Sequence, residues 1–278
     1  MSERTTSALF DLGGRVAVVT GASGTLGGEM ARGLAAAGAT VAVLGRDERR
    51  IARAVDRVRA GGGRALGLAV DVLDGDALRA ARETLLAEHG RVDVLVNAAG
   101  GNVADATLPP GGDVFDLPAD AFRQVFDLNL LGTLLPIQAF GPALCAGDDT
   151  PGVVVNVSSM TAARAVTRVI GYSAAKAAVD NLTRWLAVEL ARRHGDRLRV
   201  NAIAPGFFVA DQNRRLLLEE DGSLTERGRT IVEHTPAGRF GEADDLVGTL
   251  LWLCSDASRF VNGVIVPVDG GFSAFSGV

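Results

Sequence analysis

RVAVVTGASGTLGGEMARGLAAAG, residues 15–38, contains a strand, a glycine-rich turn and a helix in immediate succession. RVAVVT (15–20) is an apolar, β-branched run typical of a strand buried on both faces, and LGGEMARGLAAAG (26–38) is amphipathic with the period of a helix. Between them, Gly21, Gly24 and Gly27 allow a tight turn and a close approach of the backbone to a pyrophosphate at the positive end of the helix. A glycine-rich turn alone is weak evidence in a chain with 35 glycines, but its position between a buried strand and a helix favours a nucleotide site.

The same alternation of apolar strands and amphipathic helices continues along most of the chain. Further strands are expected at 40–45, 65–70, 92–97, 152–158, 198–205 and 264–269, and further helices at 47–62, 74–90, 119–144 and 172–193. Such alternation with short connections gives right-handed crossovers and a parallel sheet covered by helices on both faces. We therefore predict an α/β fold, a Rossmann-like doubly wound sheet forming a single domain over 1–278, with its ligand site beyond the carboxyl ends of the strands.

The composition describes a globular protein and excludes several classes of function. Of the 278 residues, 47% are hydrophobic and 22% are charged, and the formal net charge is -5. An acidic chain is not expected to bind nucleic acid through its phosphates. No apolar run approaches the roughly 18 residues of a membrane span, and the N-terminus lacks a signal-peptide pattern. Cys145 and Cys254 lack metal-ligand spacing, so we expect free thiols, no metal site and a reducing cytoplasm.

The residues after the second strand indicate which dinucleotide the chain prefers. An acidic side chain there would bind the ribose 2′-hydroxyl of NAD, whereas Gly45 leaves room for a 2′-phosphate and Arg46 supplies a bidentate cation. NADP is therefore predicted, with NAD as the alternative if Arg46 is an ordinary solvated loop residue. Asp71, after the third strand, is expected to accept from the adenine amino group. The full set expected to contact the cofactor is Gly21, Ser23, Gly24, Thr25, Leu26, Gly27, Gly45, Arg46, Asp71, Val72, Asn97, Ala98, Gly100, Tyr172, Lys176, Pro205, Gly206 and Phe208.

The stretch YSAAK, residues 172–176, holds the only tyrosine of the chain and its only lysine, since the other cations are all arginine. Positions i and i+4 lie on one face of a helix, so Tyr172 and Lys176 project together. A phenol with a pKa of about 10 is a poor acid or base at neutral pH, and a nearby ammonium is expected to lower that pKa into the working range. The pair is therefore a candidate catalytic group.

TGASGTLG, NAAG, FDLNLLG, NVSSM, YSAAK and NAIAPG occur in this order along nearly the whole chain. This set resembles the short-chain dehydrogenase/reductase family, whose members use an Asn-Ser-Tyr-Lys tetrad with a nicotinamide cofactor. The resemblance implies that Tyr172 is the general acid/base, that Lys176 binds the nicotinamide ribose and lowers the pKa of the tyrosine, and that Ser159 polarises the substrate carbonyl. It also implies that Asn129 holds a water that links Lys176 to a proton relay, with a buried structural asparagine as the alternative.

Two positions depart from the family pattern. Thr25 stands where the family commonly has the middle glycine of the turn, and Ala210 stands where a threonine commonly meets the nicotinamide carboxamide. Binding of the cofactor is therefore expected to depend more on backbone groups than on side chains. Because family members are typically tetramers, the resemblance also implies a homotetramer.

Polar and cationic residues around this predicted site suggest a small, hydroxylated and anionic substrate. Arg164 and Arg168 lie in the loop between Ser159 and Tyr172, where an arginine can hold a carboxylate, although both can equally be solvated surface residues. The irregular segment 207–241 is expected to form a lid over the substrate. The residues expected to contact substrate are Asn102, Arg164, Arg168, Gln212 and Asn213.

The amino-acid sequence from residue 92 onward is similar to the D-mannonate oxidoreductase (fructuronate reductase) subgroup of the family. The similar stretches include YSAAKAAVDNLTRWLAVE and DGSLTERG. That similarity implies reversible reduction of D-fructuronate to D-mannonate. A gluconate 5-dehydrogenase-like enzyme or a ketoacyl reductase is the alternative on the same scaffold. A regulator that only senses the dinucleotide would have no need for the tyrosine and lysine in register, so the sequence disfavours it.

Overall fold

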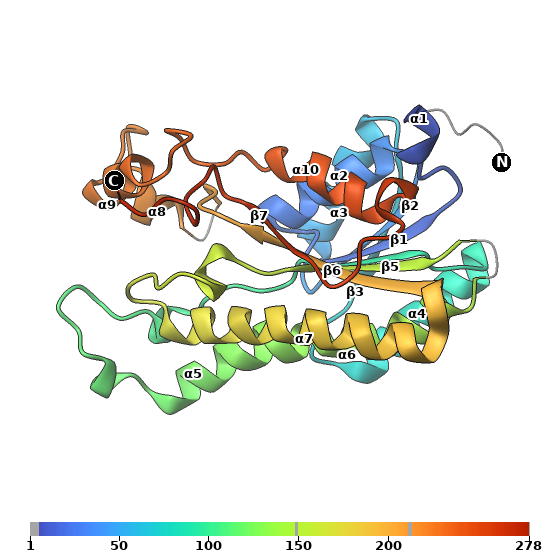
Figure 1. Ribbon diagram of the computed structural model, residues 1–278, viewed down its shortest axis with the longest axis horizontal. Helices are drawn as coiled ribbons and strands as arrows, with labels where there is room; N and C mark the ends of the chain where they lie inside the picture. Colours follow the sequence, from blue (N-terminus) through green and yellow to red (C-terminus); the bar gives the residue numbers. More distant parts are fainter. Residues whose placement is uncertain (1–5, 148–149, 211–212, 278) are drawn as a thin grey trace.

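The computed structural model describes residues 6–147, 150–210 and 213–277, and these residues contain one seven-stranded parallel sheet (Figure 1). The strand order is β3-β2-β1-β4-β5-β6-β7. This result confirms the predicted doubly wound α/β fold. The strands are β1 (Val16–Thr20), β2 (Thr40–Gly45), β3 (Arg64–Ala69), β4 (Val94–Asn97), β5 (Gly152–Val157), β6 (Leu198–Pro205) and β7 (Ile265–Val268).

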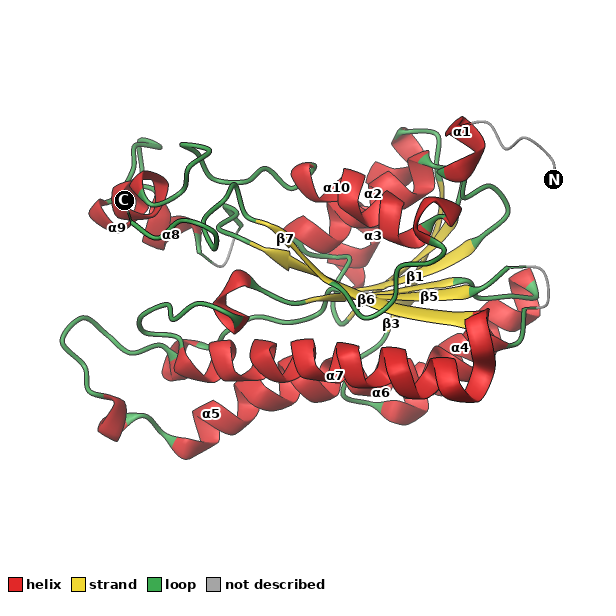
Figure 2. Cartoon of the chain, viewed as in Figure 1, coloured by secondary structure: helices red, strands yellow, loops and turns green. Residues whose placement is uncertain are grey.

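Helices cover both faces of the sheet in two layers (Figure 2). One face carries α2, α3 and α10, and the other carries α4, α5, α6 and α7. The helices are α1 (Thr6–Leu9), α2 (Thr25–Ala36), α3 (Glu48–Ala60), α4 (Gly75–His89), α5 (Ala119–Phe126), α6 (Gly132–Cys145), α7 (Ile170–His194), α8 (Arg214–Leu217), α9 (Glu226–Glu233) and α10 (Asp245–Cys254).

Alternation along each strand divides the apolar residues between two cores. In β1, Ala17 and Val19 face the core of α2, α3 and α10, while Val18 faces the core of α4, α6 and α7. All three side chains are fully buried. Because both faces are covered, the strands appear in the sequence as continuous apolar runs rather than alternating ones.

Side-chain caps mark the starts of α3 and α4 but not that of α2. The carboxylates of Asp47 and Asp74 accept hydrogen bonds from backbone N–H groups in the first turns of α3 and α4. The helix α2 begins after Gly24, which supplies no side-chain cap. The first N–H groups of α2 are therefore available to a ligand.

The predicted helix at 119–144 is interrupted by a single π turn, labelled η3, from Asp127 to Leu131. The whole stretch Ala119–Cys145 is long and apolar enough to cross a membrane by length and composition, which the inspection of apolar runs did not anticipate. Half of its most apolar window is buried inside the fold. The segment packs against α4 and α7, so its apolar character is accounted for by the core.

The position of the site follows from the order of the strands. The chain runs from β1 to β2 and β3 on one side, and then returns to place β4 against the other edge of β1. The loops that follow β1 and β4 therefore diverge and leave a crevice at the carboxyl ends of the strands.

Candidate active site

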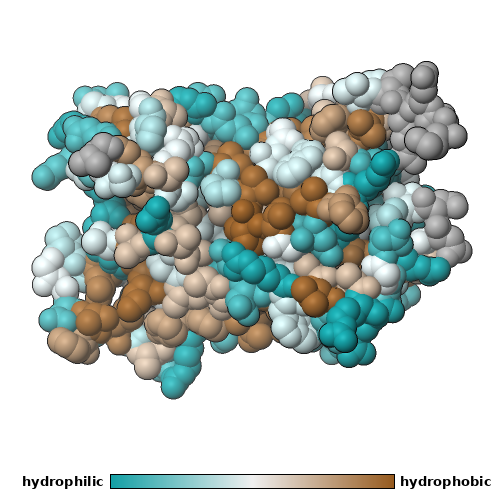
Figure 3. Space-filling view, viewed as in Figure 1, coloured by the Kyte–Doolittle hydropathy of each residue, from teal (hydrophilic) through white to brown (hydrophobic). Residues whose placement is uncertain are grey.

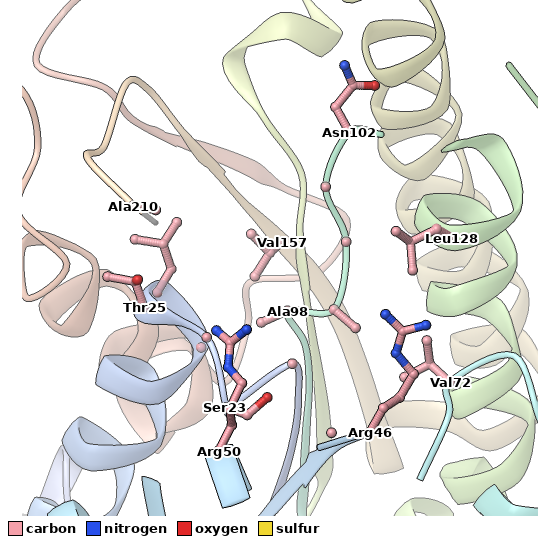
Figure 4. A pocket seen from close by; sticks show the side chains of 18 of the residues that line it. Ser23, Thr25, Arg46, Arg50, Val72, Ala98, Asn102, Leu128, Val157 and Ala210 are labelled. Atoms are coloured by element: carbon pink, nitrogen blue, oxygen red, sulfur yellow. The ribbon is translucent and has the colours of Figure 1, made fainter. Parts of the chain in front are cut away.

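A cavity of about 660 Å³ occupies this crevice. Figure 4 shows that Thr25 and Ala210 lie on one side of it, Leu128 lies on the other, and the loop that leads from Ala98 to Asn102 runs between them. Of the residues expected from the sequence, those that line the cavity are Gly21, Ser23, Gly24, Thr25, Leu26, Gly27, Gly45, Arg46, Asp71, Val72, Ala98, Gly100, Asn102, Tyr172 and Lys176.

The glycine-rich turn is held by close backbone contacts. Gly21 has a φ of 66°, and a Cβ placed on it would lie 2.7 Å from the carbonyl oxygen of Ala98. A Cβ on Gly27 would lie 2.6 Å from the carbonyl oxygen of Gly21. The departure at Thr25 falls on the first residue of α2, which lines the cavity without disturbing either contact. The turn and the uncapped helix end therefore fit a pyrophosphate.

The far end of the cavity is cationic. The Arg46 guanidinium lies 3.8 Å from the Asp71 carboxylate, and the two side chains are 74% and 42% exposed. Arg50, in the first turn of α3, also lines the cavity, and Figure 4 shows the guanidinium groups of Arg46 and Arg50 turned into it. The sequence analysis missed Arg50, although its place in the first turn after the second strand was the signal available. Gly45 packs closely on Ser23, because an added Cβ would lie 2.7 Å from the Ser23 hydroxyl.

Tyr172 and Lys176 both line the cavity. The Lys176 ammonium lies 5.6 Å from the centroid of the Tyr172 ring, as the i, i+4 spacing predicts. The same ammonium donates a 2.7 Å hydrogen bond to the backbone carbonyl of Val157, at the end of β5. The side chain of Lys176 is therefore fixed between the sheet and the cavity.

Burial dominates the proton affinities of this pair. It raises the pKa of Tyr172, while a hydrogen bond with Ser159 opposes that rise. It lowers the pKa of Lys176 to about 8, and the negative charge of Asp180 opposes that fall. The pKa of Tyr172 thus moves in the direction opposite to the one expected from an ammonium neighbour, because the cost of burying the phenolate is larger than the stabilisation from Ser159.

Ser159 and Asn129 approach the pair from two other elements. Ser159 is 7% exposed, and its hydroxyl accepts hydrogen bonds from the backbone N–H and the hydroxyl of Thr161. Asn129, in the π turn, donates to the carbonyls of Gly101 and Val125 and accepts from the N–H of Gly101. Its side chain therefore joins the loop after β4 to the helix, and the water expected at Asn129 stays a prediction.

The contacts around Gly100 show how closely these groups meet. A Cβ on Gly100 would lie 2.7 Å from Asn129 Oδ1 and 3.3 Å from Lys176 Nζ. Only a glycine leaves the space that the ammonium and the amide occupy here. Asn129 and Lys176 are thus adjacent to one another across this residue.

Ser158 and Asp180 form a buried pair behind the lysine that the sequence analysis did not single out. The Ser158 hydroxyl donates to the Asp180 carboxylate, and the two residues are 1% and 8% exposed. Burial raises the pKa of Asp180, while Ser158, Arg184 and Lys176 all lower it. The spacing of four residues from Lys176 was the available signal.

Four residues expected at the cofactor lie outside the residues that line the cavity. Asn97 is buried and donates to Asn156 on the neighbouring strand, because both side chains lie on the face of the sheet that α7 covers. Phe208 is 5% exposed and packs its ring against Gly241. Pro205 ends β6, and Gly206 packs against Asp269. Ala210, the position of the second departure, does line the cavity.

Of the residues expected to contact the substrate, only some lie at the cavity. Asn102 lines the cavity, and its Oδ1 is buried without a hydrogen-bond partner among the described residues. Arg164 donates to the carbonyl of Ser273, and Arg168 donates to the carbonyl of Leu108. Asn213 is occupied with the backbone of its own loop, at Phe208 and Ala210. Gln212 lies outside the described residues.

Comparisons with known proteins agree with this geometry. The family model described as "Enoyl-(Acyl carrier protein) reductase" matches residues 21–273. The chain is 45% identical to the Bacillus subtilis (strain 168) protein called "Uncharacterized oxidoreductase UxuB", over 96% of this chain and 98% of that one.

Two solved structures superpose on almost the whole chain. A proposed D-mannonate oxidoreductase from Haemophilus influenza with bound NAD is 38% identical, with a TM-score of 0.88 over 99% of this chain and 100% of that chain. A gluconate 5-dehydrogenase from Burkholderia cenocepacia J2315, in complex with NADP and tartrate, is 32% identical, with a TM-score of 0.85 over 98% and 100%. The chain therefore belongs to the short-chain dehydrogenase/reductase family of NAD(P)-dependent oxidoreductases.

Proposed function

We propose that the protein interconverts the ketone and the alcohol of a sugar acid, with D-fructuronate and D-mannonate as the pair. The observation that carries this proposal is that the Tyr172 phenol and the Lys176 ammonium line the same cavity as the glycine-rich turn, with the Ser159 hydroxyl hydrogen-bonded to the phenol. The similarity to a proposed D-mannonate oxidoreductase supports the choice of substrate.

Each residue of the site has a distinct task in this reaction. When bound, the nicotinamide supplies the hydride that adds to the carbonyl carbon and is itself oxidised. Tyr172 donates its phenolic proton to the carbonyl oxygen, so that the C=O π bond is replaced by a C–H and an O–H bond. The Ser159 hydroxyl, which is hydrogen-bonded to Tyr172, orients and polarises that oxygen. Lys176 stabilises the phenolate that remains and would bind the ribose, and a water held at Asn129 would link Lys176 to a proton relay.

We further propose that NADP is the preferred cofactor, with NAD as the alternative. Two arginines, Arg46 and Arg50, line the end of the cavity where the adenosine ribose would lie, and a 2′-phosphate would bring charge to both. The Asp71 carboxylate beside Arg46 competes for the same guanidinium. That competition leaves room for NAD, the cofactor bound in one of the similar structures.

Gluconate 5-dehydrogenase-like chemistry is the second candidate. It is supported by the similar structure that holds NADP together with tartrate, a small hydroxylated dicarboxylate. The unpartnered Oδ1 of Asn102 would accept from a hydroxyl of either substrate. A sensor without catalysis is disfavoured, because it gives no role to the buried Tyr172–Lys176 pair.

The arrangement of the rest of the chain is also part of the proposal. Residues 207–241 form the substrate lid of a single domain, and the protein works as a cytoplasmic homotetramer. Trp185 and Val188 support assembly, because they are 59% and 61% exposed on α7. Figure 3 shows apolar patches on the side of the molecule where α7 lies in front in Figure 1. Sedimentation velocity of the purified protein checks the oligomer.

The first experiment is spectrophotometric. Purified protein is mixed with D-fructuronate and with either NADPH or NADH, and nicotinamide absorbance is followed beside a sample without substrate. Oxidation that depends on D-fructuronate supports the proposal, and the faster cofactor identifies the preference. If 5-keto-D-gluconate is reduced and D-fructuronate is not, the second candidate replaces the first.

A further inference from the structure

Three segments that lie far apart in the sequence meet immediately before the helix that carries the catalytic tyrosine. The backbone N–H of Leu108, in the loop after β4, donates 3.0 Å to the carbonyl of Arg168. The Arg168 side chain returns a 2.5 Å hydrogen bond from Nε to the carbonyl of Leu108. Arg227, on α9 of the proposed lid, donates from a terminal nitrogen to the Thr167 hydroxyl at 3.4 Å. The junction therefore joins the loop, the lid and the start of α7.

The backbone at this junction is unusual. Arg168 has a φ of 77°, and within residues 6–147, 150–210 and 213–277 it is the one non-glycine residue with a positive φ. Residues with a side chain rarely adopt a positive φ unless surrounding contacts hold the backbone there. Such residues are concentrated at sites that bind ligands. Here the two hydrogen bonds to Leu108 enforce it, and they fix the Arg168 guanidinium in place.

The charge at the junction is unbalanced. Arg168 and Arg227 are both half-buried, and they act on one another as like charges. Burial lowers the pKa of Arg227, and the nearby Arg168 lowers it further. In the part of the chain that the structure describes, neither guanidinium forms an ion pair with a carboxylate. Two guanidinium groups held together in this way have donors left for an anion.

We propose that Arg168 and Arg227 together bind the carboxylate of the substrate, and that Arg227 brings the lid onto it. This inference rests on the proposed function, because it takes the substrate to be a sugar acid. Arg168 precedes Tyr172 by four residues in the sequence, and neither arginine is among the residues that line the cavity, so a six-carbon acid held by its carboxylate at the junction would have to extend from there to the phenol. The carboxylate neutralises the repulsion between the arginines, so binding and lid closure support one another.

The test compares a charged and a neutral substrate in matched variants. Arg227→Gln removes one guanidinium from the lid, and Arg229→Gln is the control, because Arg229 is exposed on the same helix and its side chain donates to the Leu224 carbonyl beside it. KM and kcat are measured with D-fructuronate and with D-fructose, which has a hydroxymethyl group in place of the carboxylate. Circular dichroism and thermal unfolding check that each variant folds, and Arg227→Lys retains the charge without the planar fork.

The inference predicts a specific pattern. Arg227→Gln raises the KM for D-fructuronate about 10- to 100-fold, as expected for the loss of a charge-assisted hydrogen bond, and changes the kinetics with D-fructose about twofold at most. The KM of Arg227→Lys for D-fructuronate lies between those of wild type and Arg227→Gln. The KM of Arg229→Gln resembles that of wild type. An active wild-type enzyme whose KM for D-fructuronate is unchanged by Arg227→Gln overturns the inference and leaves the proposed function standing. A wild-type enzyme that reduces no sugar acid overturns both.

Discussion

Replacement of Arg46 by glutamine tests whether the protein recognises the 2′-phosphate of NADP. The Arg46 guanidinium lines the cavity beyond the end of β2 and lies 3.8 Å from the Asp71 carboxylate. A 2′-phosphate would take over that guanidinium, because it carries more charge and more acceptor oxygens than one carboxylate. NADH lacks the phosphate, so its binding should be nearly indifferent to the substitution.

The expected loss of NADPH affinity follows from the solvent exposure of the Arg46 side chain. A hydrogen bond to a charged group contributes about 1.5 to 3 kcal/mol, and the Arg46 side chain is 74% exposed, which places it at the lower end of that range. We therefore expect kcat/KM for NADPH to fall about tenfold and kcat/KM for NADH to change about twofold at most. Asp71→Asn should have the opposite effect on NADPH, because it removes the competing carboxylate.

The assay is the initial rate at a fixed concentration of substrate with each cofactor varied in turn. Arg49→Gln is the matched control, since Arg49 is exposed in the same turn but does not line the cavity. If Arg46→Gln lowers kcat/KM equally for both cofactors, Arg46 shapes the site rather than recognising the phosphate. If it lowers neither, Arg50 must carry the recognition, and the double variant then shows the loss.

Four further predictions concern the catalytic site and two glycines. Tyr172→Phe should lower kcat about 100-fold or more while NADPH still binds, because only the proton donor is lost; fluorescence titration checks the binding, and retained turnover would contradict the assigned role. The pKa of Lys176 is about 8, and Asp180 holds it up, so Asp180→Asn should move the alkaline fall of kcat/KM to lower pH; an unchanged pH–rate profile would remove Asp180 from the mechanism. Gly27→Ala should cost about 1–3 kcal/mol of unfolding free energy, since its Cβ would lie 2.6 Å from a backbone carbonyl oxygen. Gly248→Ala, in open space on the exposed side of α10, should instead stabilise by about 0.5–1 kcal/mol, and urea titrations measure both changes.

The fold was predictable because its signals are local. Val18 and Val19 face different cores, yet both are fully buried, and burial on both faces is what makes β1 an apolar run in the sequence. The capping carboxylates of Asp47 and Asp74 fall at the starts of the predicted helices. The i, i+4 spacing likewise placed Tyr172 beside Lys176 without any knowledge of tertiary structure.

The rest of the site depends on which way a side chain turns and on contacts across the chain. Asn97 was expected at the cofactor, but a shift of one residue along a strand changes the face, and its amide lies on the face that α7 covers, where it meets Asn156. Phe208 follows β6 and packs into the core against a glycine 33 positions away. Arg227 reaches Thr167 across 60 positions of sequence. The spacing of residues along a helix or strand carries no information about contacts between distant segments. The contact between Arg227 and Thr167 therefore could not be predicted from this sequence.

The single lysine of this arginine-rich chain can now be understood from what burial demands of each cation. Arg199 is 6% exposed, and its guanidinium is satisfied by four acceptors, the Ser258 hydroxyl and the carbonyls of Val261, Leu253 and Ser255. Lys176 is 3% exposed, and one carbonyl, that of Val157, accepts from its ammonium. An arginine at position 176 would need a comparable set of acceptors beside Gly100 and Asn129, where an added methyl group already has no room. The ammonium needs fewer partners, and its remaining donors stay available to a ribose hydroxyl and to the neighbouring phenol. Replacement by arginine should therefore impair the site through unmet donors and lost space, even though the positive charge is kept.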